Sequence, residues 1–531
     1  MKPFAAPVAD ILFSFNHVAD ASRVPGYDAD MATALAEHFA SFAEGVIAPI
    51  NAPGDVEGAK LVDGRVHLPE GYNTAYRAFA EQGWTALTAP EAYGGQGLDA
   101  MTGAIISEIE TGASQAFNML VNLTPGSIRT LMAFGSDDQR ARFIPPLAEG
   151  RWLGTMCLTE PGAGSDLGRV RTRAVQAGEH YAIIGEKIFI SGGDQDISDG
   201  IFHLVLARTG AAEDGVKGLS LFACPSELAD GSRNAIRVTR IEEKMGLHAQ
   251  PTCQLVFDGA TGELIGREGE GLKAMFTLMN HARIDVALQG VAQAARAHDI
   301  ASAYAAERVQ GRGPDGAPVT IDQHADVRRM LDEIDAAALG GRAMTHLALV
   351  TMEAGDDPWL VEFLTPVIKA HCSEAALRAA ESAMQVLGGY GYLTEYGVEQ
   401  IYRDARITAI YEGANGIHAL ALAGRLIRLE NGAAFAAFAR FVEAGPQSPA
   451  LARAYAAWKA ARAHLEAEAE IGPIATAFLR LTGRVLEQAV WVRIAAVAEH
   501  HPDPERITRV AALVARQAAR AEADLAEITG A

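Results

Sequence analysis

Apolar residues recur three or four positions apart through most of the first 150 residues of the chain. This spacing places them on one face of a helix and so predicts amphipathic helices. The pattern is clearest in one set: Met31, Leu35, Phe39, Phe42 and Val46. Further helices are expected over residues 101–134 and 137–149, the latter capped by Ser136. The Pro-, Gly- and Asp-rich residues 51–71 predict an irregular connection.

The period changes near residue 151. Short runs of β-branched and aromatic residues, separated by Gly, Asp and Asn, continue to about residue 265. Strands at regular spacing with turn residues between them predict a small sandwich or barrel. The helical period returns from residue 270 and persists into an Ala-rich C-terminus. Long helices are expected over these residues: 271–310, 321–354, 358–388, 395–406 and 415–430.

This layout predicts an α+β multidomain protein. We expect five parts: an N-terminal extension (1–28), a helical domain (29–151), a β domain (152–268), a helical bundle domain (269–430) and a C-terminal helical extension (431–531). The apolar N-terminal extension needs a surface to pack on, and the body of the same protein is the expected one. In the C-terminal extension one stripe at helical spacing predicts a buried helix face: Leu479, Leu486, Val490, Ile494 and Val497.

Composition narrows the classes of function. The 531 residues, 49% hydrophobic and 21% charged, are too many for one core and typical of a globular protein. A formal net charge of −21 disfavours binding to nucleic acid and to anionic membranes. We expect no membrane span, no signal peptide and a cytoplasmic location. The cysteines are far apart, which predicts buried thiols without a disulfide framework or a metal site: Cys157, Cys224, Cys253 and Cys372.

Residues 157–166 (CLTEPGAGSD) form the first stretch that contains candidate ligand-binding residues. They follow a predicted strand and contain two glycines, two hydroxyls and two acids. Glycines let backbone N–H groups approach a ligand, and hydroxyls add donors. The spacing matches neither a dinucleotide fingerprint nor a Walker loop, since no Lys follows at the required offset. The structural alternative is a tight β-turn.

Residues 385–418 surround a single candidate base. A helical pattern breaks at Gly388 and Gly389, and Glu412 then stands between Tyr411 and Gly413. Apolar surroundings make a carboxylate harder to ionise, which suits a group that must act as a base. The alternative is a glycine-rich connection between helices in which Glu412 is a solvated turn residue.

Three separated blocks resemble the acyl-CoA dehydrogenase superfamily. Residues 159–166 resemble its T-E-P-x-A/G-G-S-D signature, and residues 187–193 (KIFISGG) resemble its K-x-W/F-I-[ST]-[NG]-[AG] strand end. The third block combines QVLGGYGY (385–392), RDAR (403–406) and YEG (411–413). The resemblance implies an N-terminal helical domain, a middle β domain and a C-terminal four-helix bundle, with FAD as the cofactor.

The resemblance covers roughly residues 30–425 and implies roles for individual residues. Glu412 matches the glutamate that removes the acyl α-proton while flavin takes the β-hydride, so the product is a 2,3-enoyl-CoA. In the family, the FAD ribityl 2′-hydroxyl and the backbone N–H of this glutamate polarise the thioester carbonyl. The implied FAD contacts are Met156, Leu158, Thr159, Gly164, Ser165, Phe189, Ser191, Arg308, Gln385, Gly388, Gly389, Ala414 and Gly416. The implied acyl-CoA contacts are Ser165, Arg283 and Gly413.

The chain departs from the family pattern directly after Glu412. Many members have Gly-Thr-x-Gln there, whereas this chain has Gly-Ala-Asn-Gly (413–416). The usual hydroxyl and amide contacts to flavin are therefore missing, and only backbone contacts can remain. The N-terminal lead, MNHAR (279–283), ERVQGR (307–312) and the C-terminal extension resemble a long bacterial branch that includes the 3-methylmercaptopropionyl-CoA dehydrogenases.

The resemblance also implies partners. It indicates 3-methylmercaptopropionyl-CoA or another short or medium acyl-CoA as the substrate and an electron-transfer flavoprotein as the acceptor. It indicates a homodimer, with a tetramer as the alternative. One rival function is an acyl-CoA oxidase, which uses O₂ as acceptor. Another is a weakly catalytic flavin-binding relative that associates with nucleic acid, which the net charge of −21 disfavours.

Overall fold

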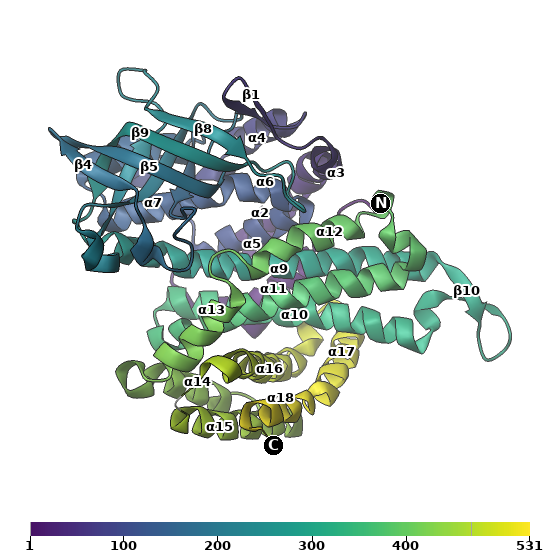
Figure 1. Ribbon diagram of the computed structural model, residues 1–531. Coiled ribbons are helices and arrows are strands. Elements are labelled where there is room, and N and C mark those ends of the chain that lie inside the picture. Colours follow the sequence, from purple (N-terminus) through teal and green to yellow (C-terminus); the bar gives the residue numbers. More distant parts are fainter. Residues whose placement is uncertain (1, 469, 531) are drawn as a thin grey trace. The chain divides into compact units, whose positions relative to one another are not determined.

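The computed structural model describes residues 2–468 and 470–530, and the side chains of residues 276–279 lie outside this description. The Met279 side chain of the 279–283 match is therefore outside the described residues. The chain divides into two compact units (Figure 1). Unit 1 contains Met1–Glu44, Ala100–Gly112 and Arg283–Ala531, and unit 2 contains Gly45–Asp99 and Ala113–Ala282.

Unit 2 combines helices with a β-sheet. Its helices are α3 (Ala48–Glu57), α4 (Tyr72–Glu81), α6 (Gln115–Val121), α7 (Leu123–Phe134) and α8 (Asp137–Ala148). Its strands are β1 (Lys60–Val62), β2 (Arg65–His67), β3 (Trp152–Cys157), β4 (Arg173–Ala177), β5 (His180–Ser191), β6 (Gly200–Arg208), β7 (Leu219–Pro225), β8 (Ile236–Ile241) and β9 (Thr252–Ile265).

The larger sheet of unit 2 closes into a small barrel. Its strand order is β3-β6-β4-β5-β9-β7, and β8 pairs with β9. A further β6–β7 pairing closes the ring β6-β4-β5-β9-β7, with β3 attached to β6. Strand β6 is buried along eight of its nine residues, because it has apolar layers on both faces. One layer includes residues of α7 and α8, such as Leu131 and Ile144, and the other includes Val205, Phe222 and Leu255. The structure thus confirms the predicted β domain and shows that it is a barrel rather than a sandwich.

Local sequence signals explain some boundaries in unit 2 and fail at others. Ser136 caps α8 as predicted: its Oγ accepts from the Gln139 N–H at 3.2 Å, and Gln139 Oε1 accepts from the Ser136 N–H at 3.0 Å. The prediction of an irregular connection over residues 51–71 is wrong. Helix α3 continues through Pro53, and the β1–β2 hairpin follows it. The Pro, Gly and Asp residues therefore correctly indicate the turn of the hairpin. They do not indicate the helix before it, because α3 tolerates Pro53.

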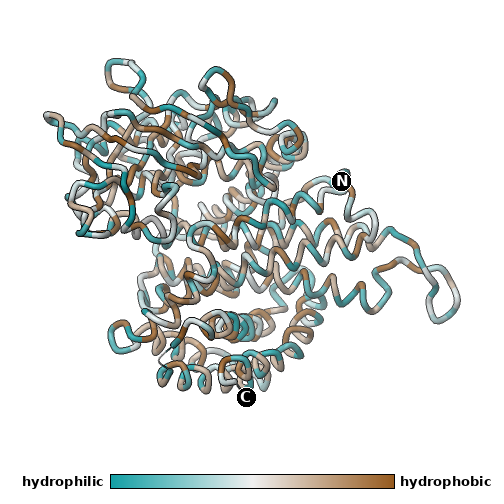
Figure 2. The backbone as a smooth tube through the Cα atoms, viewed as in Figure 1, coloured by the Kyte–Doolittle hydropathy of each residue, from teal (hydrophilic) through white to brown (hydrophobic). Residues whose placement is uncertain are grey.

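Unit 1 is mainly helical. Its helices are α1 (Val8–Phe13), α2 (Ala29–Phe42), most of α5 (Ala100–Ala113) and of α9 (Gly271–Glu307), α10 (Ala325–Ala354), α11 (Pro358–Leu387), α12 (Val398–Ala405), α13 (Asn415–Leu420), α14 (Ala433–Ala444), α15 (Pro449–Ala467), α16 (Gly472–Ala496), α17 (Pro504–Gln517) and α18 (Arg520–Thr529). A short hairpin joins β10 (Val309–Arg312) to β11 (Pro318–Thr320). The long helices expected over residues 271–310, 321–354 and 358–388 are confirmed as α9, α10 and α11, and Figure 2 shows polar residues interrupting the apolar ones along them. The helices expected over residues 395–406 and 415–430 are shorter than predicted: α12 has 8 residues, and α13 has 6 before a π-helical turn replaces it.

An aromatic cluster builds the core between α11 and the C-terminal helices. The Phe363 ring of α11 stacks on Phe438 of α14 at a centroid distance of 4.4 Å and meets the Trp458 ring of α15 edge-on at 6.4 Å. Trp458 is fully buried, and its indole N–H donates to Thr482 of α16 at 3.0 Å. Within the predicted stripe of α16, four residues are buried: Leu479, Leu486, Val490 and Ile494.

The N-terminal lead packs onto α10, as expected. Ile11 and Phe15 are fully buried, and the Phe15 ring stacks on His346 of α10 at 3.5 Å between centroids. The four cysteines are likewise buried and unbridged, as predicted. Within the described part of the chain, no helix is both long and apolar enough to cross a membrane.

A buried ionic network joins distant parts of unit 1. Arg342 on α10 is fully buried, and its Nε donates to Oε1 of Glu108 on α5 at 2.8 Å. Asp10 of α1 lies 3.8 Å from Arg342 and accepts from Arg506 of α17 at 3.1 Å. Arg506 also donates to Asp335 of α10 at 2.6 Å. Since a buried charge without its partner is strongly unfavourable, these pairs fix both ends of the chain to α10.

Replacing Arg342 with Met should destabilise unit 1 by about 3–5 kcal/mol, because Glu108 loses the cation that balances it. Urea unfolding followed by tryptophan fluorescence measures the loss. Arg453→Met is the matched control: Arg453 pairs with Glu522 at the surface, so its replacement should cost less than about 1 kcal/mol. Equal losses in the two variants would contradict a stabilising role for the buried network.

Candidate active site

The candidate base lies on a left-handed turn. The 3-10 helix η11 (Arg406–Ala409) precedes this turn, and α13 begins at Asn415 after it. Glu412 has a φ of 52° and Gly413 a φ of 93°. A left-handed backbone is uncommon for a residue with a side chain, and it persists where surrounding contacts hold it. The turn at Glu412 and Gly413 must therefore be stabilised by its neighbours.

Gly413 is required by space as well as by conformation. A Cβ on this residue would lie 2.9 Å from Nε2 of His418. The His418 ring is buried, and its Nε2 lies 3.2 Å from the carbonyl oxygen of Glu412. Burial, with the charges of Arg283 and Lys369, lowers the pKa of His418 to about 3. The ring is therefore neutral, and we assign its hydrogen to Nε2 because a carbonyl only accepts.

A buried lysine holds the next carbonyl. Lys369 of α11 is fully buried, and its Nζ donates to the Gly413 oxygen at 2.7 Å and to Asn415 Oδ1 at 3.0 Å. Burial lowers the pKa of Lys369 to about 8, although the charge of Glu412 opposes the shift. Two consecutive carbonyls of the turn, those of Glu412 and Gly413, thus accept hydrogen bonds from two different helices.

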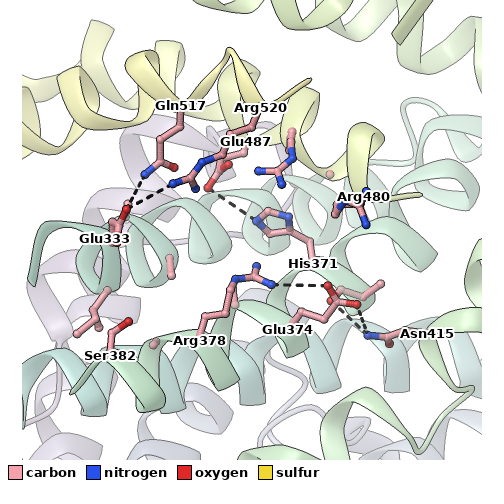
Figure 3. A pocket seen from close by; sticks show the side chains of 18 of the residues that line it. Glu333, His371, Glu374, Arg378, Ser382, Asn415, Arg480, Glu487, Gln517 and Arg520 are labelled. Carbon is pink, nitrogen blue, oxygen red and sulfur yellow. Dashed lines mark hydrogen bonds and ion pairs between the residues drawn. The ribbon is translucent and has the colours of Figure 1, made fainter. Parts of the chain in front are cut away.

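Asn415 extends this link along α11. Its amide nitrogen donates to Oγ of Ser373 and to Oε1 of Glu374, each at 3.2 Å. Figure 3 shows Asn415 beside Glu374 among the side chains that line a cavity of about 480 Å³ in unit 1. Asn415, at the variable position of the Gly-Thr-x-Gln pattern, therefore links the turn to α11.

Burial and charge act in opposite directions on Glu412. Burial raises the pKa of Glu412 above its ordinary value, and the charge of Asp285 adds to the rise. The charges of Arg283 and Lys369 lower it, because a nearby cation favours the carboxylate. The residue is half-buried. Such a group binds a proton more readily than free glutamate does and still ionises beside its two cations, which suits proton abstraction.

Helix α9 contributes two groups near the turn. Arg283 influences the carboxyl of Glu412 electrostatically, and the Tyr411 hydroxyl donates to the side-chain oxygen of Gln289. The sequence predicts Arg283 as an acyl-CoA contact, and that role stays a prediction. The structure adds that its positive charge lies near the candidate base.

A second set of predicted residues surrounds a cavity of about 430 Å³ in unit 1. Arg308, Gly388 and Gly389 line it, and the Arg308 guanidinium lies over the Tyr390 ring at 5.6 Å from the centroid. A Cβ on either glycine would meet no atom within 4 Å, so the backbone there is accessible. Gln385 is in the last turn of α11, where its carbonyl accepts from the Gly388 N–H.

The two remaining predicted residues of unit 1 begin α13. Ala414 is the N-cap residue of this helix and is half-buried. Gly416 is exposed in the first turn, and a Cβ on it would meet no atom within 4 Å. Both positions offer backbone rather than side-chain contacts, as the sequence predicts.

In unit 2 a buried ion pair ties two sequence blocks together. Lys187 of β5 is fully buried and donates to Glu160 Oε1 and to the Leu158 carbonyl, each at 2.9 Å. The Glu160 carboxylate also accepts from the backbone N–H groups of Arg171 and Thr172. The Thr-Glu-Pro loop is therefore supported by the Lys of the second block.

Phe189 is presented at the surface of unit 2. The β5–β9 register shifts between Lys187 and Ile190, and Phe189 within this irregularity has a φ of 59° and is 59% exposed. The neighbouring Ile188 N–H donates to the Thr159 carbonyl at 2.9 Å, which brings this part of β5 to the loop. Core packing does not explain an exposed phenylalanine in this conformation.

The other predicted residues of unit 2 lie on the same two segments. Met156 and Leu158 pack half-buried against the core shared with α7 and α8. Gly164 and Ser165 are exposed in the loop, and Ser191 ends β5 half-buried. The structure thus gathers the predicted residues into one set in unit 2 and two sets in unit 1, one at the Glu412 turn and one around the cavity lined by Arg308.

Sequence reasoning did not single out three functional groups of the turn. They are Lys369, Asn415 and His418. A signal for Lys369 existed: it interrupts the apolar run TPVIKAHC (365–372), and a charge in a buried helix needs partners. No sequence pattern indicates that its partners lie more than 40 residues away, at Gly413 and Asn415.

Comparison with known proteins identifies the same architecture. Family models described as the acyl-CoA dehydrogenase N-terminal, middle and C-terminal domains match residues 30–151, 155–260 and 269–427. The chain is 42% identical to the 3-methylmercaptopropionyl-CoA dehydrogenase of Ruegeria pomeroyi, over 91% of this chain and 89% of that protein. It is 34% identical to a broad-specificity linear acyl-CoA dehydrogenase of Mycobacterium tuberculosis, over 82% and 77%.

A solved structure extends the likeness of fold to both chain ends. ACDH-11 of Caenorhabditis elegans, solved in complex with C11-CoA, superposes with a TM-score of 0.81 at 19% identity. The match covers 98% of this chain and 95% of that one. The N-terminal lead and the C-terminal helices therefore belong to a fold found elsewhere.

The residues of each unit fit FAD, the cofactor of this family. In unit 2 the exposed Phe189 ring offers a face to a planar ring system, beside a loop with accessible glycines. In unit 1 the open backbone of Gly388 and Gly389 lies with Arg308 around one cavity, a donor set that suits pyrophosphate oxygens. The chain therefore belongs to the acyl-CoA dehydrogenase family of FAD-dependent oxidoreductases.

Proposed function

We propose that Glu412 is the base in a 2,3-dehydrogenation of an acyl-CoA thioester. The turn geometry carries this proposal: a carboxyl with a raised pKa lies on a left-handed turn whose two carbonyls are held by His418 and Lys369. The carboxylate takes the α-proton. The Glu412 backbone N–H, oriented by the same turn, donates to the thioester oxygen and stabilises the negative charge that develops there.

When bound, FAD supplies the acceptor for the β-hydride. In this proposal Phe189 and the residues of the 159–166 loop hold the flavin end of one FAD. Arg308 contacts the pyrophosphate, and Gly388 and Gly389 contact the adenosine side, of the FAD of a neighbouring subunit. Arg283 lies near the base, where its positive charge assists the carboxylate and attracts the anionic thioester substrate.

The substrate we propose is 3-methylmercaptopropionyl-CoA or a linear acyl-CoA of similar length. The support is the relative from Ruegeria pomeroyi, which is 42% identical over 91% of this chain. The 34% identical relative from Mycobacterium tuberculosis, a broad-specificity linear acyl-CoA dehydrogenase, favours unbranched chains. A thioether sulfur and a methylene differ little in shape, so a pocket that fits one acyl chain also admits the other.

The remaining parts of the proposal concern organisation. We infer a homodimer, an electron-transfer flavoprotein as acceptor and a cytoplasmic location. We also infer five parts with boundaries at residues 1–28, 29–151, 152–268, 269–430 and 431–531. The family-model matches at 30–151, 155–260 and 269–427 support the three central parts.

Glu412→Gln should keep FAD and lose turnover by a factor of at least about 10³, because the amide cannot accept the α-proton. Stopped-flow bleaching of the flavin absorbance by acyl-CoA measures the chemical step, and the visible spectrum before mixing checks cofactor retention. Undiminished flavin bleaching in this variant would refute the base assignment.

Gly413→Ala should lower kcat by about tenfold or more, since the new Cβ meets the His418 ring and the φ of 93° strains any residue with a side chain. Gly472→Ala is the matched control, because a Cβ there meets no atom within 4 Å. Steady-state assays with an artificial electron acceptor compare the two variants. A normal kcat in Gly413→Ala would mean that the turn tolerates a different shape.

A panel of acyl-CoAs should give the highest kcat/KM for chains near the length of 3-methylmercaptopropionyl. Pentanoyl-CoA is the matched comparison, because it carries a methylene in place of the sulfur. Its kcat/KM should differ from that of 3-methylmercaptopropionyl-CoA by no more than a factor of about 10–200. Assays with a dye under argon and with an oxygen electrode separate dehydrogenase from oxidase activity. A strong preference for long chains would contradict the substrate proposal, and oxygen consumption as fast as dye reduction would contradict the acceptor.

A further inference from the structure

Lys369 is a buried cation that the chemical steps above do not require. It lies in a stretch of α11 whose neighbours, from Leu364 to Ala370, are all buried. Its ammonium group donates to two neutral oxygens, the Gly413 carbonyl at 2.7 Å and Asn415 Oδ1 at 3.0 Å. Taking an ammonium group out of water is costly, so a lysine here needs a compensating role.

The position of Lys369 determines the shape of the turn. The Gly413 carbonyl follows the base by one peptide, and its direction is coupled to the left-handed φ of 93° at Gly413. His418 bonds the preceding carbonyl, that of Glu412. The backbone from Glu412 to Gly413 therefore has little conformational freedom. At the start of α13, the Asn415 side chain donates to Glu374 of α11, as Figure 3 shows. This bond links the residues after the turn to α11. The carboxylate and the N–H of Glu412 are thereby oriented from α11.

Titratable groups surround the turn from three helices. Arg283 and Asp285 of α9 and Lys369 of α11 act on the Glu412 carboxyl, Glu374 of α11 acts on Lys369, and the neutral His418 comes from α13. Helix α16 packs on α13, and its Arg480, Arg484 and Glu487 line the cavity that includes Asn415. Of these groups, Lys369 combines a charge that acts on the carboxyl with a hydrogen bond to the turn.

We propose that Lys369 is a positioning residue for the base: its ammonium group holds the carbonyl of Gly413, the residue after Glu412, and places a positive charge near the carboxylate. The inference rests on the proposed role of Glu412. It implies that the charge of Lys369 keeps the base ionised at lower pH, because a nearby cation lowers the pKa of a carboxyl.

Lys369→Met tests both functions, since it keeps the length of the side chain and removes the charge and the donor. We expect kcat to fall at least about tenfold and the acid limb of the kcat/KM profile to move to higher pH by about one unit. A purely structural role would lower activity without moving the acid limb. An unchanged limb in a variant with normal FAD content would therefore overturn the charge part of the proposal.

Asn415→Ala is the companion variant at a half-buried position. It keeps the charge of Lys369 but removes one of its acceptors, so we expect a smaller loss of kcat and an acid limb at the wild-type pH. Washing-in of deuterium from ²H₂O at the substrate α-carbon provides a second readout of the base without the hydride step. Wild-type exchange rates in both variants would overturn the positioning role.

The two proposals fail in distinguishable ways. If the Glu412→Gln variant is active, Glu412 is not the base, and this inference is refuted as well. Inactive Glu412→Gln together with an unshifted acid limb and wild-type exchange in Lys369→Met would leave Glu412 as the base and refute Lys369 alone. If Lys369→Met does not fold, a wild-type kcat in Asn415→Ala refutes the inference, and a reduced kcat with an unmoved acid limb supports it.

Discussion

The hydrogen bond from Lys369 to the Gly413 carbonyl is the interaction on which the geometry of the candidate site depends. Glu412 and Gly413 both have left-handed backbones, a conformation that the chain does not maintain without contacts. His418 holds one carbonyl and Lys369 the other, and the two donors come from different helices. The side chain of Glu412, the candidate base, is thus oriented through the backbone of its own turn.

Buried charges serve two distinct purposes in unit 1. Arg342 and Glu108 face each other at 2.6 Å and are both fully buried, so each neutralises the other and the pair fixes structure. Lys369 instead donates to two neutral oxygens. Its charge is therefore not cancelled at short range, and its field extends to Glu412. A buried ion therefore stabilises the fold at Arg342, whereas at Lys369 it acts electrostatically on a neighbouring carboxyl.

The sequence predicted the order of the elements well because periodicity is a local property. The long helices α9, α10 and α11, the barrel strands and the Glu412 loop are all visible in spacing and in short motifs. The sequence did not predict the irregularity of β5 at Phe189. That irregularity depends on pairing with β9, about 60 residues further along the chain, so no local pattern indicates it. The contact of Lys369 with Gly413 was equally inaccessible, since tertiary packing alone brings them together.

The C-terminal extension gains a functional meaning from the same constraint. Lys369 orients the turn only if α11 itself is fixed, and Phe363, six residues earlier, packs into the aromatic cluster with Phe438 and Trp458 of the extension. Helix α11 also packs along α10, which the buried network of Arg506 and Asp335 joins to α17. The extension therefore supports the helix that carries Lys369, although none of its residues touches Glu412 through a described hydrogen bond or ion pair. Because these contacts fix α11, the Lys369 ammonium group has a defined position, and its hydrogen bond to the Gly413 carbonyl fixes the turn relative to that helix.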